Sequence, residues 1–310
     1  MLIHPRREFP DTLLVFTGTA ISRIWPLLLV IFVLSLGMTL QYEAWHLDRF
    51  TLTLVPFTLS GLALSIFLGF RNNACYDRWW EARKLWGALI NTTRSLARLT
   101  LSLIGPDDGD PERIAFKEAV VHRIIAYAYA LRDHLRQDPR WDDLAPWLPP
   151  DELAALQGAR NAPVMLLHTL SRLYRDAWAR GLVHDLHLPT LEEQITALTN
   201  IQGGCERIKN TPVPLSYTVL THRIVGLYCF ALPFGIVGQV GDLTPAVAVF
   251  ISFAFLGLDS VGTQLEDPFE IDPNDLPLDA MCRVIEVSLL QTLGDTELPP
   301  DVAPVGGILT

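Results

Sequence analysis

The sequence predicts an all-α integral membrane protein with four transmembrane helices and a cytosolic helical domain. Half of the 310 residues are apolar and the mean hydropathy is +0.27, which is high for a soluble protein. Uncharged runs of membrane length lie toward both ends of the chain. Between them, charged residues recur every few positions and apolar residues follow helical spacing, which is typical of packed soluble helices.

The first two predicted spans form a hairpin near the amino terminus. Residues 24–42 carry no charge and are long enough to cross the hydrocarbon core at about 1.5 Å per residue. A short polar turn containing Asp48 follows, and residues 50–70 are uncharged again. The segment 1–25 mixes acids with bases and lacks a small-residue cleavage site, so we expect no removable signal peptide.

The second span continues without a break into a cluster of Arg, Asp and aromatic residues, so we expect its helix to leave the bilayer still helical. Gly61 and Gly69 would allow close helix approach. Leu62, Ile66 and Phe70 fall at i, i+4 and i+8 and form one apolar stripe. In a monomer such a stripe is ordinary packing, which periodicity alone favours, whereas around a symmetry axis it would form three stacked apolar rings.

Residues 71–223 predict a large soluble helical region. The stretch 114–131 has the pattern of an amphipathic helix, and further helices are expected over 163–180 and 190–208. A Pro, Asp and Trp-rich segment at 138–153 reads as a loop between them. The soluble part is therefore predicted to be built from helices joined by short connections.

The membrane pattern returns in the last third of the chain. Residues 224–241 and 243–258 predict a second hairpin of spans, which turns at Asp242. The cytosolic helical region resumes over 259–293. The Pro/Gly-rich tail at 294–310 cannot pack alone, and we expect it to be disordered or to lie on a neighbouring subunit.

Charge placement predicts the orientation and excludes some partners. Lys and Arg flank the predicted soluble region, whereas the outer turns carry only Arg49, so both termini are expected in the cytoplasm of a protein of the inner (plasma) membrane. A net charge of −10 without a basic stripe argues against nucleic acid as a partner. The four cysteines lack CxxC spacing, which predicts neither disulfides nor a zinc site.

No motif predicts an enzyme, because the chain has no Gly-rich phosphate loop, no GxSxG and no HExxH. His184 and His187 flank Asp185, yet no third and fourth ligand follow at motif spacing. Two surface histidines therefore explain this pair better than a transition metal does.

Three segments carry a family resemblance. They are RNNACYDRWWEARKLWG at 71–87, CERIKNTPVPLSY at 205–217 and QLEDPFEIDPNDLPLDA at 264–280. In combination they resemble the bestrophin family, in particular its prokaryotic branch, and the resemblance covers nearly the whole chain. It implies a homopentameric ion channel with four membrane helices per subunit, a helical cytosolic domain and one central pore in the lipid bilayer.

The resemblance also implies roles for single residues. Leu62, Ile66 and Phe70 match the family's pore neck, and Leu186 matches its second constriction, the cytosolic aperture. Asp185 would then place a carboxylate ring near the ion path, which benefits cations. The alternative for Leu186 is that it packs beneath its loop as a core residue.

A possible calcium site follows from the same resemblance, because eukaryotic members bind calcium in an acidic clasp after the last span. The matching stretch keeps four polar residues: Gln264, Asp267, Asp272 and Asp275. Ile271 and Pro273 replace the middle of the acidic run and remove side-chain oxygens from the roughly six to eight that calcium needs. Two alternatives stay open, a site for calcium or another divalent cation, or a turn with a helix cap built from Asp and Pro.

The function predicted from these patterns is a channel for monovalent ions. Prokaryotic members of the family are described as passing cations such as sodium, whereas eukaryotic members conduct chloride and other anions. The alternatives are a secondary transporter, which four spans without inverted repeats do not favour, and a membrane-anchored scaffold or signalling protein without ion flux.

Overall fold

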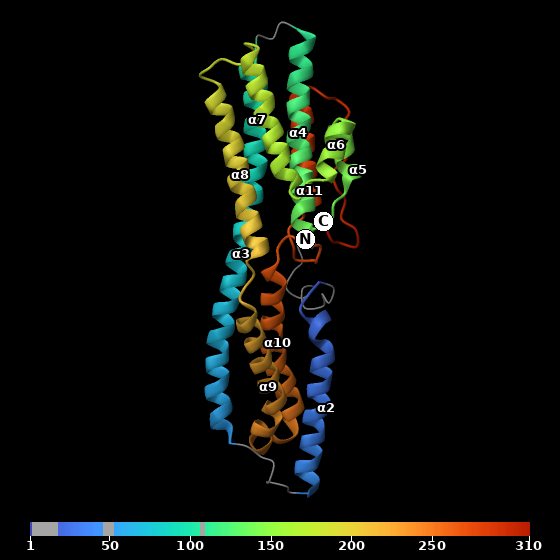
Figure 1. Ribbon diagram of the computed structural model, residues 1–310. Helices are drawn as coiled ribbons and strands as arrows, with labels where there is room; N and C mark the ends of the chain where they lie inside the picture. The colour runs from blue at the N-terminus through green and yellow to red at the C-terminus, as the bar shows by residue number, and fades with distance from the viewer. Residues whose placement is uncertain (2–17, 46–52, 106–108) are drawn as a thin grey trace. The chain divides into compact units, whose positions relative to one another are not determined.

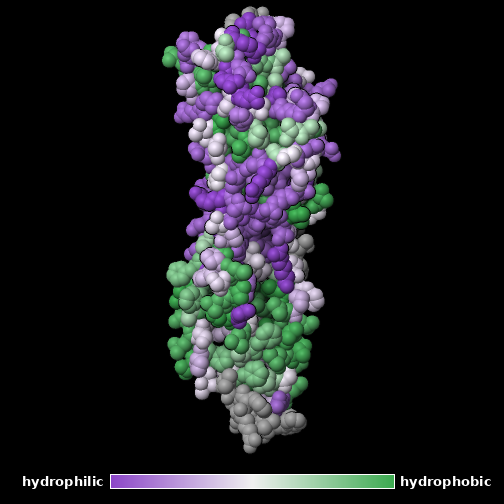
Figure 2. Space-filling model, in the orientation of Figure 1, coloured by the Kyte–Doolittle hydropathy of each residue, from purple (hydrophilic) through white to green (hydrophobic). Residues whose placement is uncertain are grey.

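The computed structural model describes Met1 and residues 18–45, 53–105 and 109–310. The polar turn around Asp48, Arg49 and the first residues of the predicted second span lie outside the described residues. The chain divides into two compact units. We call residues 4–79 and 212–268 the apolar unit, and residues 1–3, 80–211 and 269–310 the polar unit. Hydrophobic side chains cover most of the visible surface of the apolar unit, and hydrophilic ones dominate that of the polar unit (Figure 2).

The apolar unit is built from α2 (Ile21–Trp45), the first half of α3 (Leu54–Leu103), α9 (Leu215–Val240) and α10 (Thr244–Glu266). Helix α10 packs against α2 and α9, and α2 packs against α9 (Figure 1). A single turn of 3-10 helix at Gly241–Leu243 joins α9 to α10. Gly241 has a φ of +58°, a left-handed conformation that glycine adopts without strain, and the chain reverses there.

Among the described residues, three helical stretches are long and apolar enough to cross a membrane: 21–42, 54–103 and 215–266. The third stretch holds both α9 and α10, and each of these helices alone exceeds the roughly 30 Å thickness of the hydrocarbon core. Helix α3 is continuous over 50 residues, so the expectation that its helix continues well past Phe70 is confirmed.

Two glycines in the apolar unit make room for aromatic side chains of a neighbouring helix. A Cβ atom at Gly61 would lie 2.7 Å from the hydroxyl of Tyr228, and one at Gly235 would overlap the ring of Phe57. An aromatic side chain of α9 therefore packs over a glycine of α3, and an aromatic side chain of α3 packs over a glycine of α9. Gly69 has open space around it within the chain, so of the two expected glycine contacts only that of Gly61 is made here.

A buried ionic cluster joins α3 to α10. The guanidinium of Arg71 is fully enclosed and donates to the Asp259 carboxylate at 2.6 Å and to the Thr263 hydroxyl at 2.9 Å. The other oxygen of Asp259 lies 2.5 Å from Nδ1 of His222 on α9. Because a buried cation is stable only when it is paired and hydrogen-bonded, these contacts fix which face of α3 turns toward α10.

The polar unit is organised around α4 (Pro111–Arg136), which packs against α7 (Ala162–Ala179), α8 (Leu188–Asn210) and α11 (Leu278–Leu293) (Figure 1). The bounds of α7 and α8 lie within two residues of those expected. The expectation of an amphipathic helix over 114–131 was wrong, because α4 is buried nearly all round from Val120 to Leu131. A helix enclosed by three neighbours needs apolar residues on every side.

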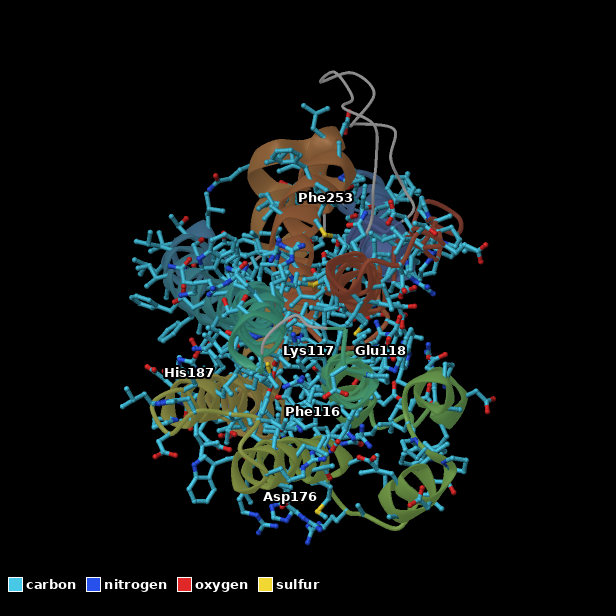
Figure 3. The ribbon with its side chains drawn as sticks, turned by 90° about the horizontal axis from the view of Figure 1, so that it is seen from above. Phe116, Lys117, Glu118, Asp176, His187 and Phe253 are labelled. Carbon is cyan, nitrogen blue, oxygen red and sulfur yellow. The ribbon has the colours of Figure 1, made fainter. Side chains whose placement is uncertain are left out.

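Hydroxyl groups tie the neighbouring helices of this unit together. Tyr127 of α4 donates to the carbonyl of Leu198 in α8 at 3.0 Å, and Thr100 of α3 and Tyr174 of α7 share a 2.6 Å hydrogen bond. Phe116 lies between α4 and α7, where its ring meets Tyr174 edge-on (Figure 3). The hydroxyls of Tyr127, Thr100 and Tyr174 thus each have a partner, as burial in an apolar core requires.

Three arginines hold Asp279 at the start of α11. Arg132 and Arg136 each donate to its carboxylate at 2.7 Å, and Arg140 lies 3.4 Å away. Burial alone would raise the pKa of Asp279, but the hydrogen bond from Arg136 and the charges of the three arginines outweigh it and hold the pKa below its usual value. This cluster joins α4 to α11.

The expectation of a loop at 138–153 was wrong. The segment 138–153 is largely helical, because it holds α5 (Trp141–Leu144), a 3-10 turn (Ala145–Trp147) and the start of α6 (Pro150–Gln157). The tail at 294–310 returns to its own unit in the single chain, where Ala280 of α11 donates to the carbonyl of Thr310 at 2.9 Å.

The glycine contact between α9 and Phe57 leads to a first prediction. Replacing Gly235 with alanine should lower stability by about 1–3 kcal/mol, because the added methyl group overlaps an aromatic ring that cannot simply rotate away. Gly226→Ala in the same helix meets no atom within 4 Å and should be neutral or stabilising by up to about 1 kcal/mol. Thermal unfolding of both variants in detergent checks this, and equal midpoints would contradict it.

The buried ionic cluster leads to a second prediction. Arg71→Gln should destabilise the protein by about 3–5 kcal/mol, because it leaves the Asp259 carboxylate enclosed without its cation. The double variant Arg71→Met with Asp259→Leu should lose less stability than Arg71→Gln does, since it removes both charges of the pair. Arg98→Gln, on an exposed position of the same helix, is the control. The prediction fails if the double variant unfolds at a lower temperature than Arg71→Gln.

Candidate functional site

The apolar stripe of α3 lies on the face that turns away from the helices of its own unit. Leu62, Ile66 and Phe70 are 64%, 51% and 65% exposed in the single chain. The buried residues of the same segment are Phe57, Gly61, Leu64, Leu68, Arg71 and Cys75. At about 100° per residue the two sets centre on opposite sides of the helix. The packing of α3 therefore leaves the whole stripe free to face another surface.

The outward face extends beyond the three residues that the sequence singled out. Val55 and Leu59 share the helical phase of the stripe and are also exposed. Past Phe70 the same face becomes polar, with Asn73 and then Asp77, both exposed. Helical spacing from Phe70 would have located Asp77, which the sequence reasoning missed.

The predicted aperture residue lies at the tip of a short loop between α7 and α8. The base of this loop is fixed, since Gly105 donates to the carbonyl of Leu182 at 3.2 Å and Val183 forms a β-bridge with Ile104. Leu186 is 76% exposed, so the alternative that it packs in the core of its own chain is wrong. A large apolar side chain at an anchored tip suits a contact outside the subunit.

Polar neighbours shape the tip. The indole N–H of Trp178 donates to the Asp185 carboxylate at 2.6 Å, and the backbone N–H of Leu186 donates to Nδ1 of His184 at 3.1 Å. His187 lies at the amino-terminal end of α8 (Figure 3), and its ring centroid is 5.6 Å from that of His184. The first of these contacts orients Asp185 and the second holds the backbone of Leu186 at the surface.

The acidic stretch after α10 forms a closed turn. Asp275 accepts a hydrogen bond from the backbone N–H of Asp272 at 2.7 Å, and its own N–H donates to the carbonyl of Asp272 at 3.0 Å. Gln264 lies in the last turn of α10, which ends at Glu266, and its amide donates to Ser260 at 3.1 Å. Asp267 follows directly after the helix. The bonds between Asp272 and Asp275 fit a turn, whereas the helix that follows, α11, has Pro277 at its N-cap and no side-chain cap.

Calcium would need about six to eight oxygens around one point. In the part of the chain that the structure describes, no group of three or more His, Cys, Asp or Glu residues is placed to hold a metal ion. The function proposed below does not depend on a metal at the acidic stretch.

Comparison with known proteins assigns this arrangement to a family. The family model described as "Bacterial/Fungal Bestrophin protein" matches residues 1–291. A relative from Mesorhizobium japonicum is 36% identical over 304 residues, covering 98% of this chain and 95% of that protein. A relative from Ralstonia nicotianae is 36% identical over 312 residues, and this match covers 100% of each of the two chains. Both relatives are named voltage-dependent anion channel-forming proteins.

Solved structures agree with the sequence comparison. The crystal structure of a bacterial bestrophin homologue from Klebsiella pneumoniae superposes with a TM-score of 0.82 at 34% identity, covering 87% of this chain and 98% of that one. Bestrophins are channels rather than enzymes, so the prediction that this protein is not an enzyme is confirmed. With matches of this extent in both sequence and fold, the chain belongs to the bacterial and fungal bestrophin family.

Proposed function

We propose that this protein is a bestrophin channel that assembles as a homopentamer in the inner membrane and conducts monovalent ions. In this assembly α2, the first half of α3, α9 and α10 are the four spans, and both termini lie in the cytoplasm. The observation that carries the proposal is the exposed apolar face of α3, opposite the face that packs against the subunit's own helices. The channel-forming names of the relatives support the same conclusion.

In this proposal Leu62, Ile66 and Phe70 form the pore neck. Symmetry would repeat each side chain around the axis and stack three apolar rings. An ion that passes such rings loses part of its hydration shell, and water leaves a narrow apolar constriction readily. The neck would therefore set the barrier to conduction.

The aperture is the second constriction of the proposed pore. Five copies of the anchored loop would bring five Leu186 side chains to the axis, with Asp185 held beside each of them by Trp178. A single apolar ring on a fixed loop imposes a shorter barrier than the neck does, because it removes water over a smaller distance.

Two observations bear on the charge of the permeant ion, and they favour opposite signs. The names of the relatives favour anions. The carboxylates of Asp77, on the neck face of α3, and of Asp185, beside Leu186, favour cations, because rings of negative charge raise the local concentration of cations. The sign of the reversal potential in a sodium chloride gradient decides between them.

The neck proposal predicts a gain in conduction when its rings are made smaller. Replacing Leu62, Ile66 and Phe70 together with alanine should raise single-channel conductance or open probability in planar bilayers, because wider rings leave more water around the ion. Leu227→Ala with Phe250→Ala removes equally exposed side chains from α9 and α10 and serves as the control.

Unchanged currents in the neck variant, or an equal gain in the control, would mean that this face of α3 contacts lipid. Light scattering in detergent tests the assembly separately, and a monomer would exclude the pore. Absence of any flux from a reconstituted pentamer would favour the alternative of a scaffold protein.

The carboxylate of Asp77 gives a prediction that holds for either permeant ion. Asp77→Asn should move the reversal potential toward the equilibrium potential of chloride, because it removes one ring of negative charge from the ion path. Asp151→Asn, an exposed change on α6, should leave the potential unchanged. If both variants reverse at the wild-type potential, Asp77 does not line the pore.

A further inference from the structure

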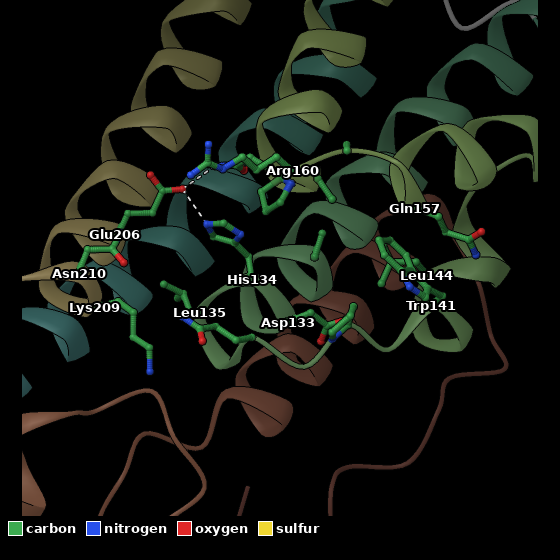
Figure 4. Close-up of a pocket in the computed structure, with 17 residues that line it drawn as sticks. Asp133, His134, Leu135, Trp141, Leu144, Gln157, Arg160, Glu206, Lys209 and Asn210 are labelled. Atoms are coloured by element: carbon green, nitrogen blue, oxygen red, sulfur yellow. Dashed lines mark hydrogen bonds and ion pairs between the residues drawn. The ribbon is translucent and has the colours of Figure 1, made fainter.

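The polar unit contains a cavity of about 700 Å³ that the channel function does not use. It is bounded by the carboxyl-terminal ends of α4 and α8, the short α5, and the segment that leads into α7 (Figure 4). A cavity of this size matches the range of about 300–1,000 Å³ that small-molecule sites occupy. The side chains around it include a charged group at Glu206 and an apolar group around Trp141, together with further polar residues.

Glu206 and its partners form the charged end. Oε1 of Glu206 lies 3.2 Å from Nε2 of His134, 2.9 Å from the amide nitrogen of Asn161 and 2.8 Å from that of Gln202. These three contacts fix the carboxylate. All of them use Oε1, so the second oxygen accepts no hydrogen bond from the described residues. A fixed carboxylate with one open oxygen is suited to an ammonium group.

Arg160 supplies the opposite charge. It lies in the turn between α6 and α7, directly before Asn161, which caps α7 by accepting from the N–H of Val164 at 3.2 Å. Its guanidinium makes no ion pair with any described residue, although it lines the same cavity as Glu206. The amino-terminal end of α7 adds positive potential on this side, and the ends of α4 and α8 add negative potential on the other.

Asp133 and Lys209 also line the cavity, but both are engaged in ion pairs, Asp133 with Arg132 and Lys209 with Glu270.

Apolar side chains form another part of the lining. This part includes Leu135, Pro139, Trp141 and Leu144. Figure 4 shows Trp141 and Leu144 across the cavity from the linked pair His134 and Glu206. A ligand that places its charged groups at Glu206 and Arg160 would therefore direct the remainder of its structure toward an aromatic and aliphatic surface.

We propose that this cavity binds an α-amino acid with an apolar or aromatic side chain. The ligand's ammonium group would bind the open oxygen of Glu206, its carboxylate would bind Arg160, and its side chain would lie against Trp141 and Leu144. One zwitterion satisfies both unengaged charges, whereas a simple anion or cation would leave one of them unpaired. This proposal does not rest on ion conduction.

The position of the cavity would allow a bound ligand to affect the proposed aperture. It lies where α7 begins and α8 ends, and the loop that carries Leu186 joins the other ends of these two helices. A ligand that binds here contacts both helices of the hairpin that presents the aperture residue.

Binding to the purified full-length protein in detergent tests the proposal. Isothermal titration calorimetry with L-phenylalanine should show saturable binding in the millimolar range or tighter. 3-Phenylpropanoate, which lacks the ammonium group, and 2-phenylethylamine, which lacks the carboxylate, should each bind about tenfold more weakly or worse, because each loses one charge-assisted hydrogen bond. Equal binding of all three compounds, or no binding of phenylalanine or leucine, overturns the proposal.

Variants test the two charged residues without relying on ion flux. Arg160→Gln and Glu206→Gln should each weaken phenylalanine binding about tenfold or more. Arg160 is exposed, so its substitution leaves the fold intact, and glutamine at 206 keeps an acceptor for its three donors. Arg172→Gln on α7 and Glu193→Gln on α8, both exposed, are the controls. If Arg160→Gln binds as the wild type does, the carboxylate site is wrong, whatever the channel conducts.

Discussion

The burial of Arg71 is the constraint on which the apolar unit depends. A fully enclosed guanidinium must keep its carboxylate and hydroxyl partners, and these belong to α10, 188 and 192 positions further along the chain. The rotation of α3 about its own axis is thereby fixed. Because the stripe that begins at Leu62 lies half a turn away from the buried face, the same ion pair that joins the helices also presents that stripe to the outside.

Much of this fold could be predicted from the sequence, because its signals are local. Uncharged runs identified the helices of the apolar unit, and helical periodicity placed α7 and α8 to within two residues of their observed ends. The exposed stripe on α3 could be read from spacing alone. The role of this stripe could not be predicted from spacing, because apolar residues are found both on faces that contact lipid and on faces that line an apolar pore.

Features that depend on long-range packing could not be predicted. In the sequence, Arg71 has the position of a positive charge that flanks the end of a span. Its partner Asp259 lies far along the chain, and no local pattern links the two residues. Helix α4 looked amphipathic because its first turns are, and its burial on every side follows only from the three helices around it. The segment 138–153 was predicted to be a loop because it is rich in proline. Two of these prolines occupy the first positions of short helices, where proline is favoured, and do not interrupt them.

The opposed faces of α3 also restrict how this protein can vary in length. One residue inserted between Phe57 and Arg71 would turn everything beyond it by about 100°, so that the glycine contact at one end and the ion pair at the other could no longer form together. Only a change that restores the helical phase would be tolerated. We therefore expect natural insertions and deletions among homologues to avoid this segment and to gather in the connections between helices.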